Sequence, residues 1–429
     1  MSLLIEVKEE IDLIKELFPI CRSITGSGVR ETLNILSKYV PIEIHEVKSG
    51  TKVFDWIVPD EWNINDAFIE CPDGTKIAEF SKNNLHVMSY SEPVDNIMSL
   101  EELSDHIHTL PDHPEWIPYR TMYYDRSWSF CLSQNTLDEL SSGSYRAYID
   151  SKFSKGSLTY GEVLIPGKSD KEIVFSCYVC HPSMCNDNLS GVSVATKLAQ
   201  TLSKMENLYY SYRILFIPET IGAITWLSKN EERLDKIAGG VVLTCIGNND
   251  KLTFKRSRWD TSLVDKAMKK CLESFKTSYR ELKFSPSGSD ERQYCSPGIN
   301  LPFLTLMRSA PSKFDEYHTS ADNIEFMHQP SLKESHDICV KFVSMLEKNQ
   351  KYKNLYPKCE PQLGKRGIYR KVGGQKANSN TQTAMKWILN YSDGNHDIFQ
   401  IADLSGMSIE DLSYAANILE EKCVIQKEY

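Results

Sequence analysis

Two patterns of apolar positions alternate along the chain from residue 144 onward. Short runs rich in Val, Ile, Tyr and Phe are typical of strands, and the run at 171–180 is almost wholly apolar, as in strands buried on both faces. Between such runs, apolar residues recur at helical spacing, as at Ala195, Leu198 and Leu202. The strand-like segments are 144–153, 157–167, 171–180, 212–219 and 239–247. This alternation predicts an α/β domain whose central sheet is mostly parallel and is flanked by helices.

The first 140 residues show two other patterns. Residues 4–39 carry apolar positions at helical spacing on both sides of a break at 23–28. From 50 to 140 the chain is rich in Trp, Pro and Asp, and the turn dipeptide in CPDGTKI indicates a hairpin. We therefore predict that 1–49 joins 141–350 in one α/β domain, and that 50–140 forms a small β-rich inserted domain.

The last 80 residues predict a connector and a small domain. Residues 348–380 carry nine Lys and Arg against one acidic residue, so 351–380 is predicted to be a basic, partly irregular connector. Residues 381–429 follow the order helix, helix, Gly turn, helix, strand, with Ser408 and Asp411 resembling a capping box. This order predicts a winged helix. Its three Lys and eight Asp or Glu argue against DNA binding, because that binding depends on phosphate neutralisation.

Composition narrows the class of protein. The chain has 429 residues, 41% of them hydrophobic and 25% charged, which are ordinary globular proportions. Its net charge of −9 argues against a surface built to bind nucleic acid or anionic lipid. No apolar run reaches the ~18 residues of a membrane span, and the N-terminal segment lacks the features of a signal peptide. We therefore expect a cytoplasmic protein.

The 12 cysteines are expected to be mostly buried free thiols, because a chain of this length without an export signal needs no disulfide framework. If any thiol is functional, we expect it to be Cys180, Cys185 or Cys245. Cys177 and Cys180 with His181 also match the C-x-x-C-H pattern of haem attachment, but they lie within an apolar strand. A structural zinc site of Cys180, His181 and Cys185 is a better alternative, although it lacks an obvious fourth ligand.

Three segments carry candidate metal ligands or acid–base groups. Two of them follow strands, beyond the carboxyl ends where ligands bind in α/β sheets, and the third is a polar loop. His181 and Asp187 follow the apolar run at 171–180, and both side chains are good zinc ligands. Glu219 ends the next strand, where a partly desolvated carboxylate can accept a proton from water activated by a metal. His318 lies in a polar loop.

Taken in order, these segments resemble the zinc aminopeptidase family that includes bacterial leucyl aminopeptidases and glutamate carboxypeptidase. The matching motifs are His181 at a strand end, Asp187-Asn-Leu-Ser-Gly191, Glu219 with Gly222, and Tyr317-His318-Thr-Ser-Ala-Asp322, and a Ser289-Asp290 pair precedes the expected substrate-pocket loop. The arrangement is most similar to an aminopeptidase-like branch with a β insertion and a C-terminal winged helix. Genes of that branch often accompany polysaccharide biosynthesis.

The resemblance implies a zinc exopeptidase-like fold and a zinc-dependent hydrolase. His181, Asp187 and His318 would hold zinc, and Glu219 would be the general base. The two-metal members have a second Glu where this chain has Thr220, and an Asp where it has Thr244. Each metal thereby loses a carboxylate ligand, so one zinc is expected rather than two.

The expected substrate is a peptide or small amide with a free amine. Asp290, Glu291 and Glu316 are candidates to bind the amine, and Arg292 or Tyr317 to contact the carbonyl side. Two alternatives stay open: a catalytically degenerate peptidase fold that acts as a binding or regulatory protein, and a single-zinc acyl transferase or cyclase. No membrane or nucleic-acid partner is expected, and assembly into a homo-oligomer is left open.

Overall fold

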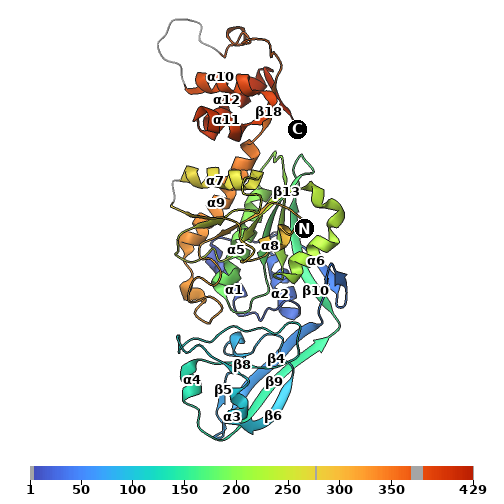
Figure 1. The fold of residues 1–429 in the computed structure, drawn as a ribbon, viewed down its shortest axis with the longest axis vertical. Helices are drawn as coiled ribbons and strands as arrows, with labels where there is room; N and C mark the ends of the chain where they lie inside the picture. Colours follow the sequence, from blue (N-terminus) through green and yellow to red (C-terminus); the bar gives the residue numbers. More distant parts are fainter. Residues whose placement is uncertain (1–3, 276–277, 369–379, 429) are drawn as a thin grey trace. The chain divides into compact units, whose positions relative to one another are not determined.

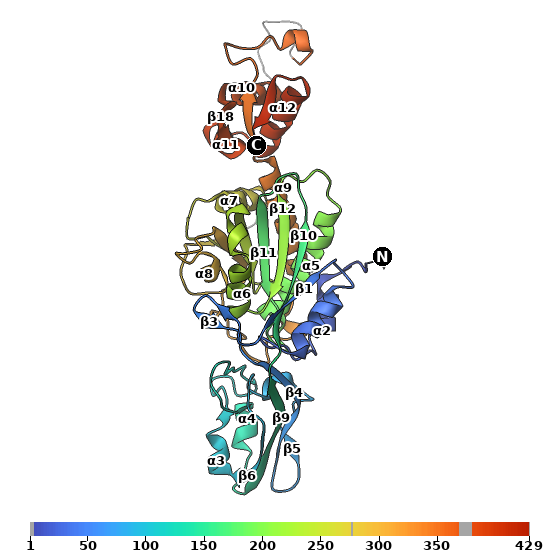
Figure 2. The same cartoon turned by 90° about the vertical axis from the view of Figure 1, so that its right-hand side faces the viewer.

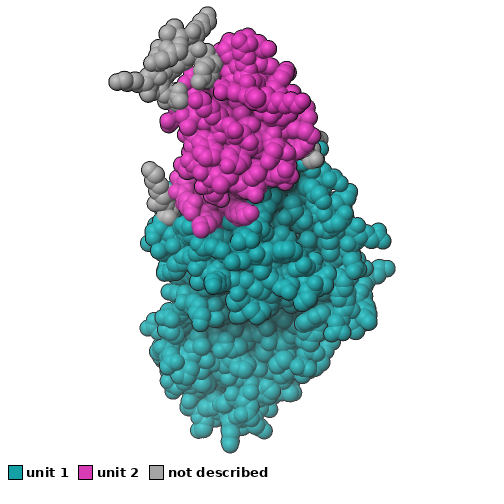
Figure 3. Space-filling view, turned by 45° about the horizontal axis from the view of Figure 1, so that its top comes forward, with its two compact units in different colours: residues 1–265, 275–340 teal, residues 266–274, 341–429 magenta. Residues whose placement is uncertain are grey.

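The computed structural model describes residues 4–275, 278–368 and 380–428. Two compact units make up the chain and are coloured separately in Figure 3. The first comprises residues 1–265 and 275–340, and the second comprises 266–274 and 341–429. Among the described helices, none combines the length and apolar character that crossing a bilayer requires.

An eight-stranded mixed sheet forms the centre of the first unit (Figure 1). Its strands, in spatial order, are β1 (Glu43–Lys48), β10 (Ser157–Ile165), β12 (Ser211–Ile217), β11 (Glu172–Tyr178), β13 (Ile237–Leu243), β16 (Phe303–Met307), β14 (Thr253–Lys255) and β15 (Arg280–Leu282). The four strands β12, β11, β13 and β16 run parallel. Every residue of β11 and β12 is buried, as the continuous apolar runs predict. The predicted α/β fold with a helix-flanked central sheet is confirmed.

Helices cover both faces of this sheet (Figure 2). On one face, α6 and α8 pack over Val174, Leu215 and Val242, which lie on three neighbouring strands. α5 contacts β10, β11, β12 and β13 as well as α1. The helices of the first unit are α1 (Glu10–Leu17), α2 (Ser27–Leu36), α5 (Ser190–Ser203), α6 (Ile221–Lys229), α8 (Glu291–Tyr294) and the first part of α9 (Gln329–Lys348). Most of α7 (Leu263–Phe275) belongs to the second unit.

The β-rich insertion has its own antiparallel sheet and its own core, which includes Ile69, Val87, Phe130 and Tyr145. The strand order is β5 (Lys76–Ile77), β4 (Glu61–Glu70), β9 (Ser144–Ser154) and β6 (Val94–Ser99). Smaller elements are β2 (Lys52–Val53), β3 (Trp56–Ile57), α3 (Leu100–Ser104), β7 (Ile107–His108), β8 (Phe130–Cys131) and α4 (Gln134–Asp138). The sequence assigned 144–154 to the α/β domain, whereas β9 pairs with β4 and β6 of the insertion. Alternation along a single strand does not identify the sheet that it joins.

From residue 351 onward, the described part of the second unit forms a three-stranded sheet and three helices in winged-helix order. The elements are β17 (Lys351–Asn354), α10 (Asn380–Tyr391), β18 (Asp393–Asp397), α11 (Ile398–Ser405), α12 (Ile409–Glu421) and β19 (Ile425–Glu428). Gly406 ends α11 with φ 67°, and Ser408 caps α12 by accepting the Asp411 N–H. β17 lies within the segment predicted as a connector, of which 369–379 lie outside the described residues.

A buried ion network joins three strands of the main sheet. Arg213 on β12 is 2% exposed and binds Glu172 on β11 through two N–H groups, at 2.7 and 3.0 Å. Its third nitrogen lies 2.9 Å from Glu162 on β10. The more exposed Arg233 also binds Glu172, at 2.6 Å, but Arg213 is the buried cation that contacts both carboxylates. Its removal would therefore leave two largely buried carboxylates with weaker compensation.

We predict that Arg213→Met lowers the free energy of unfolding by about 3–5 kcal/mol, the usual cost of breaking a buried ion pair from one side. Thermal unfolding followed by circular dichroism measures this change. The matched control is Arg280→Met, which removes an exposed bidentate pair with Asp250 and should change the stability little. Equal effects of the two substitutions would contradict the prediction.

Candidate metal centre

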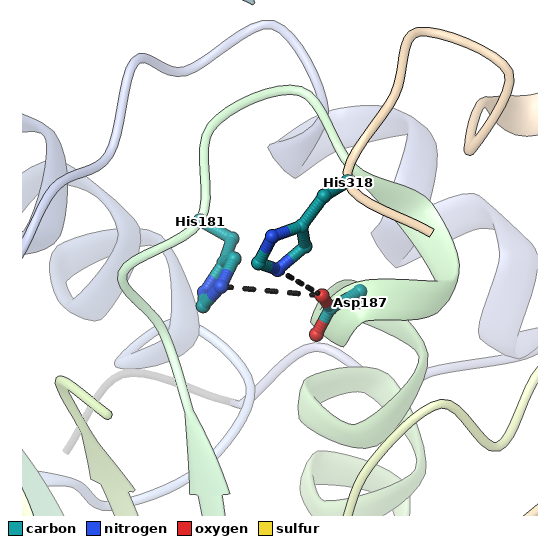
Figure 4. A group of neighbouring side chains, drawn as sticks. All are labelled: His181, Asp187 and His318. Atoms are coloured by element: carbon teal, nitrogen blue, oxygen red, sulfur yellow. Dashed lines mark ion pairs between the residues drawn. The ribbon is translucent and has the colours of Figure 1, made fainter. Parts of the chain in front are cut away.

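Three side chains from separate segments meet at the carboxyl end of the central strands (Figure 4). His181 follows β11, Asp187 lies in the short turn before α5, and His318 lies in the loop after β16. Asp187 Oδ2 is 3.0 Å from His318 Nε2 and 4.0 Å from His181 Nε2. These are the three residues that the sequence nominates as zinc ligands.

The positions of the donor atoms suit coordination of a metal better than hydrogen bonding between the side chains. Asp187 Oδ2 and His318 Nε2 are both buried and make no hydrogen bond of acceptable geometry among the described residues, despite their short separation. All three donors lie within 4.8 Å of one another. Because Zn–N and Zn–O bonds are about 2.0–2.2 Å long, donors to one ion lie roughly 3–4 Å apart. Two imidazoles and a carboxylate around a shared point therefore suit a zinc ion.

The protonation states of these groups also suit a metal. Burial lowers the pKa of His181 to about 4, so its imidazole is neutral near pH 7 and can act as a ligand. Burial raises the pKa of Asp187, but the two imidazoles and the Tyr178 hydroxyl outweigh this effect and bring it to about 2. The carboxylate is therefore charged.

Glu219 stands beside the three donors. It follows β12, and its Oε2 lies 3.9 Å from His181 Nε2, while its Oε1 accepts a 3.0 Å hydrogen bond from the Ser289 hydroxyl. Burial, followed by the negative charge of Asp187, raises the pKa of Glu219 to about 7. A carboxylate with this pKa is suited to accept and return a proton near neutral pH.

The second oxygen of Asp187 is held by hydroxyl groups. Tyr178 donates a hydrogen bond to Asp187 Oδ1, and the Thr244 hydroxyl lies 2.7 Å from the Tyr178 oxygen. The resemblance to zinc aminopeptidases implies a carboxylate ligand at this position in two-metal members, where this chain has Thr244. Sequence reasoning assigned no role to Tyr178. The clue in the sequence is a tyrosine near the end of a buried, mostly apolar strand, because a buried tyrosine hydroxyl requires a hydrogen-bond partner.

Asp322 fixes the turn that carries Asp187. Its carboxylate accepts the N–H groups of Asn186 and Asp187 at 2.6 and 2.9 Å, and its carbonyl accepts the Cys185 N–H at 3.0 Å. Burial raises the pKa of Asp322 to about 8. The sequence placed Asp322 in the His318 motif without a role. The structure shows that it links the segments of two of the donors.

The inserted domain holds the His318 loop. The Tyr119 N–H donates to the His318 carbonyl at 2.7 Å, Pro118 and Thr319 form a β-bridge, and Ser320 exchanges hydrogen bonds with Ile117. The Tyr119 ring also packs edge-on to the His318 imidazole. The insertion therefore helps to position a candidate ligand.

A cavity of about 320 Å³ opens onto His181, Glu219 and His318. The insertion contributes most of its aromatic lining, and Cys180 also lines the cavity. The Cys180 sulfur accepts the Glu219 N–H at 3.2 Å, and all 12 cysteines are free. The wall residues are Trp56, Tyr119, Thr121, Tyr123 and Tyr124. The insertion therefore covers the candidate site.

Of the residues expected to bind substrate, two carboxylates are buried and already bonded within the protein. Asp290 is 1% exposed and accepts the Thr220 N–H at 2.7 Å, and burial together with nearby Glu219 raises its pKa well above the usual range. Glu291 is fully buried and is bonded to Lys255 at 2.5 Å, so its charge is already neutralised. Neither carboxylate is free to bind an amine. Arg292 is exposed and donates to the Thr220 hydroxyl at 3.2 Å.

The two remaining candidates flank His318. Tyr317 stacks on the His318 ring, with centroids 3.9 Å apart, and this contact orients the imidazole. Glu316 is partly exposed, and its carbonyl accepts the Thr319 N–H, a bond that shapes the loop. Its carboxylate makes no hydrogen bond or ion pair among the described residues.

A second group of possible donors comprises Glu43, His45 and Glu162. Glu162 is already bound by Arg213 at 2.9 Å and by the Trp226 N–H at 3.0 Å. One of the two carboxylates of this group, Glu162, is therefore already engaged within the protein.

Known proteins resemble this chain over nearly its whole length. A family model described as a domain of unknown function, DUF4910, matches residues 11–349, and one described as a winged helix-turn-helix matches 350–427. A Clostridium acetobutylicum protein, named as a candidate polysaccharide biosynthesis protein with an aminopeptidase-like domain, is 52% identical over 96% of this chain and 94% of its own length.

Solved structures extend the comparison. A candidate peptidase from Clostridium acetobutylicum matches with a TM-score of 0.90 and 49% identity, over 98% of this chain and 96% of the other. A zinc aminopeptidase from Bacillus subtilis matches with a TM-score of 0.59 and 13% identity, over 80% of this chain and 95% of the other. The fold of the first unit is thus that of zinc aminopeptidases.

We predict that Asp322→Asn weakens zinc binding by about 10- to 100-fold, the usual effect of removing a group that orients a ligand. Competition with a fluorescent chelator measures the affinity. The matched control is Asp265→Asn, because Asp265 is also a buried acceptor of two backbone N–H groups, at Ser257 and Ser262. An unchanged affinity in Asp322→Asn, or an equal loss in the control, would contradict the positioning role.

Proposed function

The chain belongs to the DUF4910 family, and from this membership and the geometry of its metal centre we propose that it is a zinc-dependent, aminopeptidase-like hydrolase. The observation that carries the proposal is the convergence of His181, Asp187 and His318, with the Glu219 carboxylate 3.9 Å from His181 Nε2. The fold shared with zinc aminopeptidases and the name of the Clostridium acetobutylicum relative support it. We place the activity in polysaccharide biosynthesis, as that name suggests.

The three ligands would hold one zinc ion, whose Lewis acidity would polarise the scissile carbonyl and make water nucleophilic at neutral pH. Glu219 accepts the proton of the attacking water and returns it to the leaving amine. The Ser289 hydroxyl holds Oε1 of this carboxylate, so that Oε2 lies on the side of His181. The aromatic wall from the insertion limits access of bulk water to the reacting groups.

Two features support one zinc rather than two. Asp187 Oδ1, the oxygen that would bridge to a second ion, accepts a hydrogen bond from Tyr178. The positions of the two carboxylates that complete the two-metal centres are occupied by Thr220 and Thr244, and a neutral hydroxyl is a weaker ligand for zinc than a carboxylate. Three protein donors with one open position are characteristic of a catalytic zinc.

We predict one zinc per chain in the purified protein and loss of tight zinc binding in His318→Ala, because this substitution removes one of three donors. Mass spectrometry of metal content after dialysis measures both. The control His328→Ala removes an imidazole that is bonded to Ser331 outside the centre and should retain zinc. Two zinc ions per chain would contradict the single-site arrangement.

We predict that Glu219→Gln reduces kcat by about 10²- to 10⁴-fold and leaves the zinc content unchanged, because the amide cannot accept the proton but retains the shape of the side chain. Hydrolysis of a series of aminoacyl amides, with metal content measured on the same samples, provides the test. Full activity in Glu219→Gln would exclude the general-base role. A zinc-loaded wild type that hydrolyses no aminoacyl amide would favour the binding-protein alternative.

A further inference from the structure

A second cavity, of about 450 Å³, adjoins the metal centre. Its wall includes Ser289, whose hydroxyl is bonded to Glu219, and Thr244, whose hydroxyl contacts Tyr178. These two residues therefore lie between the reacting groups and the second cavity. A substrate side chain directed past these two residues from the metal centre would enter this cavity.

The lining of this cavity is dominated by hydroxyl groups. Eight lining residues are Ser or Thr, and only four have apolar side chains, namely Leu282, Met307, Ala310 and Pro311. The hydroxyl-bearing residues are Thr244, Thr253, Ser285, Ser287, Ser289, Thr305, Ser309 and Ser312. Five of these hydroxyls are already bonded within the protein, at Thr244, Thr253, Ser285, Ser289 and Ser309. An apolar side chain in this space would give no hydrogen bond to a hydroxyl that still lacks a partner.

One of these hydroxyls is buried without a partner. Thr305 lies on β16 and is 2% exposed, and its Oγ1 makes no hydrogen bond among the described residues. Most buried polar atoms in proteins have a hydrogen-bond partner, so an exception on a cavity wall calls for one. A polar ligand in the cavity would supply it.

The charges of the lining favour an anion. Lys255, Arg280 and Lys313 face two acidic residues, Asp250 and Glu291. Arg280 is paired with Asp250 at 3.0 Å, and Lys255 with Glu291 at 2.5 Å. Lys313 makes no ion pair within the described part of the chain, so the lining retains one uncompensated positive charge.

We propose that this cavity is the specificity subsite of the hydrolase and that it binds a carboxylate-bearing side chain, as in an acidic N-terminal residue. The proposal rests on the proposed function, because it assumes that the acyl part of the substrate enters from the metal centre. Thr305 donates a hydrogen bond to the carboxylate, and Lys313 balances its charge at the rim. The two subsite residues are separate from the ligands and from Glu219, so their variants leave the reacting groups intact.

Isothermal titration calorimetry of the zinc-loaded full chain tests this subsite with three probes of similar size: L-glutamate, L-glutamine and L-leucine. We expect glutamate to bind most tightly, followed by glutamine and then leucine. Thr305→Val and Lys313→Gln should each weaken glutamate binding by about three- to tenfold, the range expected for one hydrogen bond or ion pair. Lys313→Gln should also reduce the preference for glutamate over glutamine.

Matched controls separate binding from folding. Thr225→Val removes another buried hydroxyl that lacks a partner, on α6 and outside the cavity, and Lys152→Gln removes an exposed lysine of β9. Both should leave glutamate binding unchanged. Because Thr305→Val removes an unsatisfied buried hydroxyl, its melting temperature should not fall, so weaker binding cannot result from poor folding.

Leucine or glutamine binding as tightly as glutamate would overturn the proposal, as would unchanged glutamate binding in both subsite variants or no binding of any probe. Separate assays of leucyl and glutamyl amides distinguish failure of the subsite from failure of the hydrolase. Cleavage that favours the leucyl amide would overturn the subsite and leave the proposed function standing. Cleavage that favours the glutamyl amide, with the preference reduced in Lys313→Gln, would support both.

Discussion

The parallel pairing of β11 and β12 is the constraint on which the candidate metal centre depends. Tyr178 pairs with Ile217, so both strands leave the sheet at the same level. His181 lies three residues beyond the end of one strand and Glu219 two residues beyond the end of the other, and their side chains come within 3.9 Å. β13 pairs along the other edge of β11 and delivers Thr244 to the same end. Backbone hydrogen bonds, which are insensitive to side-chain identity, thereby determine where the chemical groups meet.

The sheet alone does not complete this centre. His318 comes from a long loop after β16, and the main-chain bonds to this loop include those from Ile117 and Tyr119 of the insertion. Asp322, four residues beyond His318, binds the turn that carries Asp187. The insertion, the loop and the turn therefore form one connected hydrogen-bonded assembly. The domain that the sequence predicts as a small β-rich insertion is thus part of the scaffold that orients a candidate ligand.

The sequence predicted the elements that present the centre because buried strands and amphipathic helices leave clear periodic patterns. His181, Asp187 and Glu219 were candidates because they are polar residues that follow apolar strands, whereas His318 joined the ligand set through the resemblance to zinc aminopeptidases. The sequence could not predict that Asp290 and Glu291 are buried and bonded within the protein rather than available to a substrate. Glu291 is neutralised by Lys255, which lies 36 residues away along the chain, and only the fold brings the two together. The same limit hid Tyr178 and Asp322, whose roles are set by partners distant in sequence or by backbone N–H groups that carry no sequence signal.

Charge balance supports the proposal of one zinc ion and is consistent with Thr220 and Thr244 in place of two carboxylates. Asp187 carries one negative charge, and Glu219 supplies a second when it is deprotonated, which together match a single Zn²⁺. Burial raises the pKa of the neighbouring Asp290, which keeps a third charge out of the centre. Carboxylates at positions 220 and 244 would add two buried negative charges, which are costly to desolvate unless a second cation compensates them. Threonine at both positions avoids this cost, and in Thr244 the hydroxyl also supports the hydrogen bond from Tyr178 to Asp187.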